Sequence, residues 1–371
     1  MKKETLMKMN FNSQPSFDYC GGVDLHSENF YVYIINREGK KIQSGKVATT
    51  NQEIRRYFEP YRDLGLTVAV EIGTPTFWFC DTLNSMEIKT YIVNTLANNL
   101  ISKSHKKTDR IDAKTLAYQL WKDMLPEAVY KPPHNQRELR QMVSQRNQYV
   151  KLRSQTINRA HALLKNHGVM ERKSDMRSVN YRSELLANLA HMNHTFLHRL
   201  QADWSSIKFL TGQIKNLETE MYGHVKKYFF DQYLRLITIP GVGFITATCM
   251  IAVVGDWGRF KDARKVSSYV GIVPNVSISS DKMVGSNGIT KLGNNLARGY
   301  LVQAALGVLK SKDQTAQPLK EWYQAMRIKK GWKKARVILA RKLCCIMFGM
   351  MKDGTDYDPL LLTKNSKPVV N

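Results

Sequence analysis

Short β-rich runs alternate with helical segments over the first third of the chain, and this alternation predicts an α/β domain. Residues 20–35 contain two such runs around a polar turn at His26–Asn29, which indicates a hairpin. The run Leu66–Ile72 has the continuous apolar character of a buried strand, and a helix over Phe77–Met86 is expected after it. Because ligands of such sheets gather at the carboxyl ends of strands, we expect a functional site there.

Four acidic residues fall at the positions that such a site would use. Asp24 lies inside the first expected strand and Glu71 near the end of the buried one. Asp109 and Asp112 begin a helix in the motif K-T-D-R-I-D-A-K-T-L-A, and their spacing places both carboxylates on one helix face. Carboxylates from two strands and a following helix suit Mg²⁺ in a two-metal phosphoryl-transfer site, as in the ribonuclease-H-like fold. Any one of these acids alone would more simply be a turn or surface residue.

The charge balance indicates a polyanionic partner. Lys and Arg number 56 against 31 acidic residues, which gives a net charge of +25. Basic blocks recur at Lys103–Lys107, Arg137–Arg153 and Lys329–Lys342, so we expect a long track along nucleic acid rather than one patch. The alternative is a generally basic protein without such a partner.

Other partners and compartments are disfavoured by the composition. No apolar run reaches the length of a membrane span, so we expect no membrane contact and a cytoplasmic protein. The five cysteines are scattered and form no C-x-x-C pair, which indicates neither a zinc site nor a disulfide framework.

Two long amphipathic helices are expected in the middle of the chain. The first begins near Asn135 and ends near Gly168, and the second covers about His194–Tyr228 with a nearly heptad apolar seam. They most simply form an antiparallel coiled-coil arm, which either dimerises or only spaces the two ends of the protein. His191, His194 and His198 share a helical spacing, but no acid or cysteine joins them, so an exposed helix face is expected rather than a metal site.

The C-terminal part contains two further candidate features. The sequence I-P-G-V-G before an apolar helix is typical of a helix-hairpin-helix motif, in which the N–H groups at Gly241 and Gly243 would bind a phosphate. An ordinary glycine turn between core helices is the alternative. The polar segment after Pro274 is expected to be a loop, and a serine within it could act as a nucleophile beside Lys282 or Lys291. A solvated loop is the commoner structure for such a segment.

The motifs together resemble the DEDD-type transposases of insertion sequences in the one-hundred-and-ten group, relatives of the Piv DNA invertase. The resemblance runs from about Gly22 to about Gly354. It is carried by G-V-D, V-A-V-E, K-T-D-R-I-D-A-K-T-L-A, I-P-G-V-G, Y-V-G-I-V-P, G-I-T-K-L-G-N-N-L-A-R and K-A-R-V-I-L-A-R-K-L. It implies a RuvC-like N-terminal domain that binds Mg²⁺ through Asp24, Glu71, Asp109 and Asp112, and a mainly α-helical C-terminal transposase domain with a serine nucleophile.

Ser279 matches the family nucleophile best. The family usually has glycine after its serine, whereas this chain has Ser280, so a one-residue slip would make Ser280 the nucleophile. A second departure is I-G-T-P after Glu71, which affects the turn more than the acid.

The resemblance also implies partners. A structured bridge RNA guides the pairing of double-stranded target and donor DNA, and the active site is shared between subunits of a homo-oligomer, a dimer or tetramer, in the bacterial cytoplasm with the nucleoid. The residues expected to bind nucleic acid are Lys107, Arg110, Gly241, Gly243, Lys282, Lys291 and Arg298. The expected divisions are a flexible 1–18, the catalytic domain 19–133, the arm 134–230, the transposase domain 231–353 and a tail 354–371.

Two other functions remain open from the sequence. In a RuvC-like junction resolvase the four acids would activate water, and the serine segment would only bind DNA. A non-catalytic DNA-bridging protein would use the arm and the helix-hairpin-helix motif alone.

Overall fold

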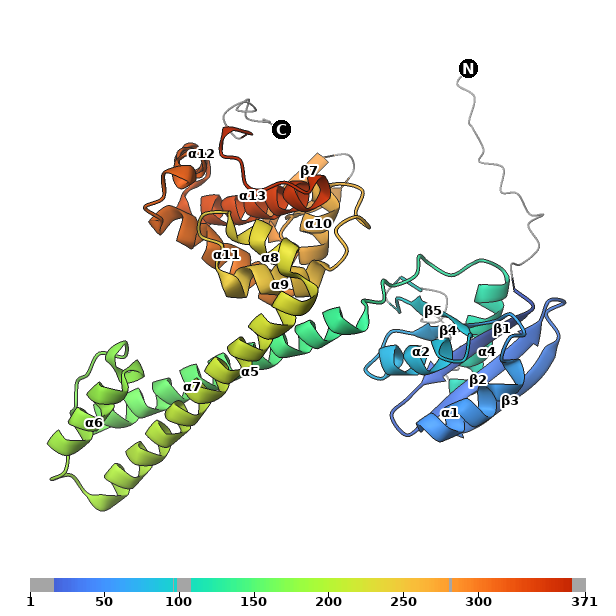
Figure 1. Ribbon diagram of the computed structural model, residues 1–371, viewed down its shortest axis with the longest axis horizontal. Helices are drawn as coiled ribbons and strands as arrows, with labels where there is room; N and C mark the ends of the chain where they lie inside the picture. Colours follow the sequence, from blue (N-terminus) through green and yellow to red (C-terminus); the bar gives the residue numbers. More distant parts are fainter. Residues whose placement is uncertain (1–16, 96, 99–107, 280–281, 362–371) are drawn as a thin grey trace. The chain divides into compact units, whose positions relative to one another are not determined.

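The computed structural model describes residues 17–95, 97–98, 108–279 and 282–361 (Figure 1). The chain divides into two compact units, Met1–Lys131 and Pro132–Asn371. Each unit has its own hydrophobic clusters, so each is described by itself.

The first unit is built on a five-stranded sheet in the order β3-β2-β1-β4-β5. Strand β1 pairs antiparallel with β2, as the expected hairpin requires, and parallel with β4. Strand β3 was not predicted, because its residues are mostly polar and half-exposed at the sheet edge. The strands are β1 (Tyr19–Leu25), β2 (Asn29–Asn36), β3 (Lys41–Ala48), β4 (Leu66–Glu71) and β5 (Lys89–Val93).

Helices cover both faces of this sheet. Helices α1 (Asn51–Phe58) and α2 (Thr76–Asn84) pack on one face against a cluster that includes Val23 and Val70. Helix α4 (Asp109–Trp121) packs on the other face, where Ala69 joins the helix's apolar residues. Alternate residues of a strand point to opposite faces, so the fully apolar strand β4 is explained by burial on both sides.

Two long helices of the second unit run antiparallel to each other. The helices are α5 (His134–Asn166) and α7 (His194–Tyr228). As the residue number rises along α5 it falls along α7, because Arg146 bonds to Glu218, Arg153 to Thr211 and Arg159 to Asp203. The segment between them adds α6 (Val179–Asn188), which packs with both helices in one cluster. The antiparallel arrangement of the two helices is the one expected from the sequence. Coiled-coil packing between them in the strict sense stays a prediction.

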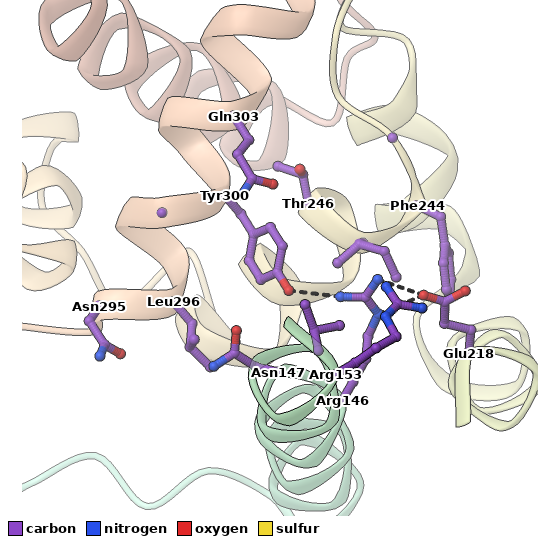
Figure 2. Close-up of a pocket in the computed structure, with 14 residues that line it drawn as sticks. Arg146, Asn147, Arg153, Glu218, Phe244, Thr246, Asn295, Leu296, Tyr300 and Gln303 are labelled. Carbon is purple, nitrogen blue, oxygen red and sulfur yellow. Dashed lines mark hydrogen bonds and ion pairs between the residues drawn. The ribbon is translucent and has the colours of Figure 1, made fainter. Parts of the chain in front are cut away.

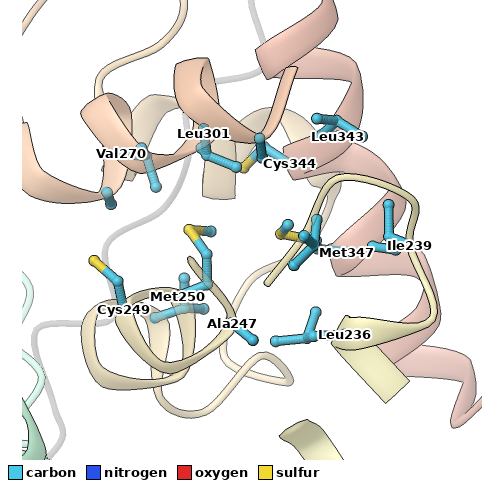
Figure 3. Packing of buried hydrophobic residues seen from close by; sticks show 14 of the residues in the cluster. Leu236, Ile239, Ala247, Cys249, Met250, Val270, Leu301, Leu343, Cys344 and Met347 are labelled. Carbon is cyan, nitrogen blue, oxygen red and sulfur yellow. The ribbon is translucent and has the colours of Figure 1, made fainter. Parts of the chain in front are cut away.

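The C-terminal helices surround α9 (Phe244–Val254), whose residues Thr246–Val254 are all buried. Figure 3 shows side chains of α9 meeting Val270, Leu301 and Met347 from three other helices. The other helices are α8 (Phe230–Ile237), α10 (Ala263–Val270), α11 (Asn295–Lys310), α12 (Gln317–Lys330) and α13 (Trp332–Asp353). Residues after this bundle also pack on it, because Tyr357 N donates to Thr238 Oγ1 at 3.0 Å and belongs to the expected tail.

The segment after Pro274 is not the irregular loop that the sequence suggested. It forms a two-stranded antiparallel hairpin from β6 (Pro274–Ser279) and β7 (Lys282–Ile289). Alternation of Val276 and Ile278 with polar residues supports a strand in a segment whose composition resembles a loop.

All five cysteines are free thiols, and four of them, Cys20, Cys80, Cys249 and Cys344, are buried. Burial raises the pKa of Cys20, Cys249 and Cys344 to about 12. No helix of the described residues is long and apolar enough to cross a membrane.

Candidate active site at the edge of the sheet

The parallel register of β1 and β4 brings Asp24 and Glu71 to the same edge and face of the sheet. The last paired residues are Val23 and Val70, so Asp24 and Glu71 each follow by one residue. Gly22 lies two residues before Asp24 and contacts α4, and the period of two therefore turns Asp24 toward α4 as well. The two acids that the sequence placed on separate strands are neighbours.

Helix α4 approaches this edge very closely because Gly22 has no side chain. A Cβ at Gly22 would lie 2.0 Å from the carbonyl oxygen of Ala113 and 2.4 Å from the amide nitrogen of Ala117. The helix begins at Asp109, after Thr108, whose hydroxyl accepts from the Ile111 N–H at 3.3 Å. The first turn, with Asp109 and Asp112, is thus fixed beside the strand that carries Asp24.

His26 completes the cluster and was not predicted as a site residue. His26 Nε2 lies 3.3 Å from Asp24 Oδ2 and 4.0 Å from Asp109 Oδ1. One ligand atom from each of these three residues lies within 4.8 Å of the others, the spacing of groups that can share a metal ion. The spacing in D-L-H could have indicated that His26 lies beside Asp24, because residues two apart at the end of a strand point to the same side.

Electrostatics at Asp24 favour a bound cation. Its side chain is 20 % exposed, against 54 % for Asp109. Burial raises the pKa of Asp24 above its ordinary value, His26 opposes this, and the negative charges of Asp109 and Asp112 add to it. Among the ion pairs of the described residues, none joins these three acids to a Lys or Arg. Carboxylates crowded in this way fit a divalent cation, which would remove their mutual repulsion.

The turn after Glu71 is ordered by Thr76. The Thr76 hydroxyl donates to the Glu71 carbonyl and accepts from the Gly73 N–H, both at 2.8 Å. The unusual I-G-T-P segment therefore forms a defined turn that leaves Glu71 at the end of β4. One oxygen of the Glu71 carboxylate is shielded from solvent.

The expected nucleophile lies in the second unit. Ser279 is the last residue of β6 and pairs with Lys282, the first residue of β7, so it lies at the tip of the hairpin. Ser280 and Lys107 lie outside the described residues.

The other expected nucleic-acid residues have different environments. Gly241 adopts a positive φ of 80°, and a Cβ there would lie 2.3 Å from the amide nitrogen of Val308, so this glycine serves packing on α11. Arg298 donates to the carbonyls of Val270 and Gly293, both at 3.0 Å, which gives it a structural role. Gly243, Arg110 and Lys291 are exposed.

The five-stranded mixed sheet and the acid cluster make the first unit an α/β domain that fits the expected ribonuclease-H-like fold. Sequence comparisons agree. A transposase family model of the DEDD, IS110 type matches residues 21–168, and a model for the transposase IS116/IS110/IS902 family matches residues 233–321. The chain therefore belongs to the IS110 family of insertion-sequence transposases.

Individual relatives include transposases and a pilin gene-inverting protein. The chain is 26 % identical to the transposase of insertion element IS1111A from Coxiella burnetii, over 91 % of this chain and 90 % of the relative. It is 24 % identical to a putative transposase of Sinorhizobium fredii, over 91 % of this chain and 84 % of the relative. A pilin gene-inverting protein of Moraxella lacunata is 28 % identical over 33 % of this chain and 38 % of its own length.

Proposed function

We propose that this transposase cuts and rejoins DNA through Ser279, with Asp24, Glu71, Asp109 and Asp112 as the acids of a Mg²⁺ site. The observation that carries the metal site is the crowding of Asp24, Asp109 and Asp112 without a Lys or Arg ion pair among the described residues. When bound, the cation would neutralise charge on the scissile phosphate. His26 would hold Asp24 in place through its hydrogen bond.

In the proposed chemistry the Ser279 hydroxyl forms a bond to phosphorus and loses its proton to water. The phosphodiester bond to one DNA end breaks, and that end leaves as a hydroxyl after gaining a proton. A hydroxyl of the partner strand then attacks the phosphoserine bond and returns the serine to its starting state. The position of Ser279 at the last pair of the β6–β7 hairpin supports this role, because the turn of a hairpin can be presented to a DNA strand.

Guidance by a bridge RNA, double-stranded target and donor DNA as substrates, and a homo-oligomeric active site are parts of the same proposal. The net charge of +25 supports contacts to more than one nucleic-acid strand. In this arrangement base pairing to the RNA would choose the sequence, and the protein would recognise the shape of the paired strands.

Trapping of a covalent product tests the mechanism. Purified protein is incubated with labelled DNA carrying the ends of its element, in Mg²⁺ and any co-purified RNA, and denatured before electrophoresis. We expect DNA attached to protein with wild type and with Ser280→Ala, and none with Ser279→Ala. Attachment that survives in Ser279→Ala and disappears in Ser280→Ala would move the nucleophile by one residue.

The same assay separates the other two functions. Cleavage without attachment, retained in both serine variants, would indicate a resolvase that uses water. DNA bridging that is unaffected by Asp24→Asn or by removal of Mg²⁺, with no cleavage at all, would indicate a non-catalytic protein.

A further inference from the structure

A pocket of about 660 Å³ in the second unit is lined by none of the residues assigned to catalysis above. Figure 2 shows it between the middle of α5 and the beginnings of α9 and α11, with one residue from α7. Its polar and aromatic lining comprises Arg146, Asn147, Arg153, Glu218, Phe244, Thr246, Asn295, Tyr300 and Gln303.

One arginine of the pocket is neutralised and serves as a scaffold. Arg146 donates through Nε to Glu218 Oε1 at 2.7 Å, and its Nη2 lies 2.6 Å from the same oxygen. Its Nη1 donates to the Tyr300 hydroxyl at 3.0 Å, which fixes the orientation of the tyrosine ring (Figure 2). The ring of Tyr300 is therefore held at the pocket wall before any ligand arrives.

The second arginine carries uncompensated charge. Arg153 makes no ion pair among the described residues, and its Nη1 donates only a weak hydrogen bond, at 3.4 Å, to the Thr211 hydroxyl. Burial lowers its pKa, and the positive charges of Arg177 and Arg146 lower it further, against the opposite effect of Glu218. A half-buried guanidinium in such surroundings favours an anionic partner.

The first turn of α9 offers further donors. Gly243 is the N-cap and has no side chain to accept from the first amides, and helical bonding begins with the Ala247 N–H and the Gly243 carbonyl. The neighbouring α11, by contrast, is capped by Asn294. Thr246 lines the pocket with only 7 % exposure, and among the described residues its side chain has no hydrogen-bond partner. A hydroxyl without a protein partner in the wall of a cavity can bond to a ligand there.

The pocket is too large for a phosphate alone. Beyond the cationic side it has the aromatic rings of Tyr300 and Phe244 and the amides of Asn147, Asn295 and Gln303. Aromatic faces stack with unpaired bases, and amides donate to and accept from base edges. The lining therefore matches a nucleotide with both its phosphate and its base.

We propose that this pocket binds one unpaired nucleotide of a nucleic-acid strand. Arg153, the Thr246 hydroxyl and the first amides of α9 hold its phosphate, and the base lies against Tyr300 within reach of the amide side chains. The inference rests on the proposed function in that it presupposes nucleic-acid binding, but it needs neither the serine chemistry nor the metal.

Equilibrium binding of short strands tests the pocket. Full-length protein is titrated into fluorescent 12-nucleotide RNA, DNA of the same sequence and the 12-base-pair DNA duplex, without divalent metal. For Arg153→Gln we expect about tenfold weaker binding of at least one single strand, and less than twofold change for the duplex. Lys208→Gln is the matched control, because it removes the same charge from an exposed residue of α7 outside the pocket and outside the basic blocks, and it should change binding less than twofold.

Thr246 provides a second test that does not depend on charge. Thr246→Val keeps the shape and removes the hydroxyl, and we expect roughly fivefold weaker single-strand binding. Thr246→Ser keeps the hydroxyl and should bind as wild type does, provided that thermal melting shows both variants folded. Photo-crosslinking of a 5-iodouridine strand should label Tyr300 or Phe244.

The outcomes distinguish the two proposals. If wild type binds no nucleic acid, the pocket and the recombinase function both fail. If wild type binds but Arg153→Gln and Thr246→Val bind like Lys208→Gln, and crosslinks fall elsewhere, only the pocket fails. The RNA and DNA arms show which kind of strand supplies the nucleotide.

Discussion

At the scale of one residue, Asp24 shows how a candidate site can lower the stability of the fold that carries it. Its raised pKa means that the folded protein disfavours the ionised form, mainly because the carboxylate is partly buried. Ionisation of the Asp24 carboxylate therefore costs folding free energy as long as no cation is present. Replacement by a neutral residue of the same shape should remove the cost.

We therefore expect Asp24→Asn to raise the melting temperature of the metal-free protein by a few degrees. The same variant should lose most of the stabilisation that Mg²⁺ or Mn²⁺ gives to wild type. Differential scanning fluorimetry with and without metal measures both effects, and Glu28→Gln, an exposed acid on the same turn, is the control. A variant that melts lower than wild type without metal would contradict the electrostatic argument.

At this scale the sequence indicates the clustered acids but not the histidine that lies beside them. Asp24, Asp109 and Asp112 were recognisable because acids are rare on apolar strands and meaningful at helical spacing. His26 was missed because its role depends on the register between β1 and the start of α4, which no local pattern contains. The environment of Gly241 likewise comes from packing against α11, and that of Arg298 from the carbonyls of Val270 and Gly293.

At the scale of secondary-structure elements, the close contact between β1 and α4 brings the candidate site residues together. Gly22 allows the backbone of α4 to lie where any side chain would otherwise be, and the first turn of that helix carries two of the acids. The glycine of G-V-D thus contributes through close approach rather than through a turn.

Gly22→Ala should destabilise the first unit by about 2 to 3 kcal/mol, because the new Cβ meets backbone atoms that cannot rotate away. It should also weaken metal binding, since α4 must shift with Asp109 and Asp112. Chemical denaturation and metal titration measure the two effects. Gly45→Ala in β3 is the control, because its Cβ would make only ordinary contacts near 3.9 Å with Tyr57, and equal losses in both variants would refute the argument.

Elements with strong periodicity were predictable, and the weaker ones were not. The helices α5 and α7 and the strand β4 carry long or continuous apolar patterns, which local sequence reveals. Strand β3, helix α12 and the β6–β7 hairpin are short or polar, and their structure depends on partners elsewhere in the fold.

At the scale of the whole molecule, the acids and the serine belong to different units of the chain. If the active site is shared between subunits, as we propose, a subunit with intact acids and one with an intact serine can complement each other. Mixed oligomers of Asp24→Asn and Ser279→Ala should then recover covalent DNA attachment, to about a quarter of wild type for a randomly mixed dimer. Mixtures as inactive as each variant alone would place both parts of the site in one subunit.

The rates at which the buried thiols react can report local unfolding of the protein. Because Cys20 and Cys80 lie in the first unit and Cys249 and Cys344 in the second, their alkylation by a thiol reagent reports each unit separately. Partly exposed Cys345 should react first and provides the reference rate for an accessible thiol. Peptide mapping over hours would then show in which unit the buried cysteines are alkylated faster. It would also show whether metal slows alkylation in the first unit and leaves that in the second unchanged.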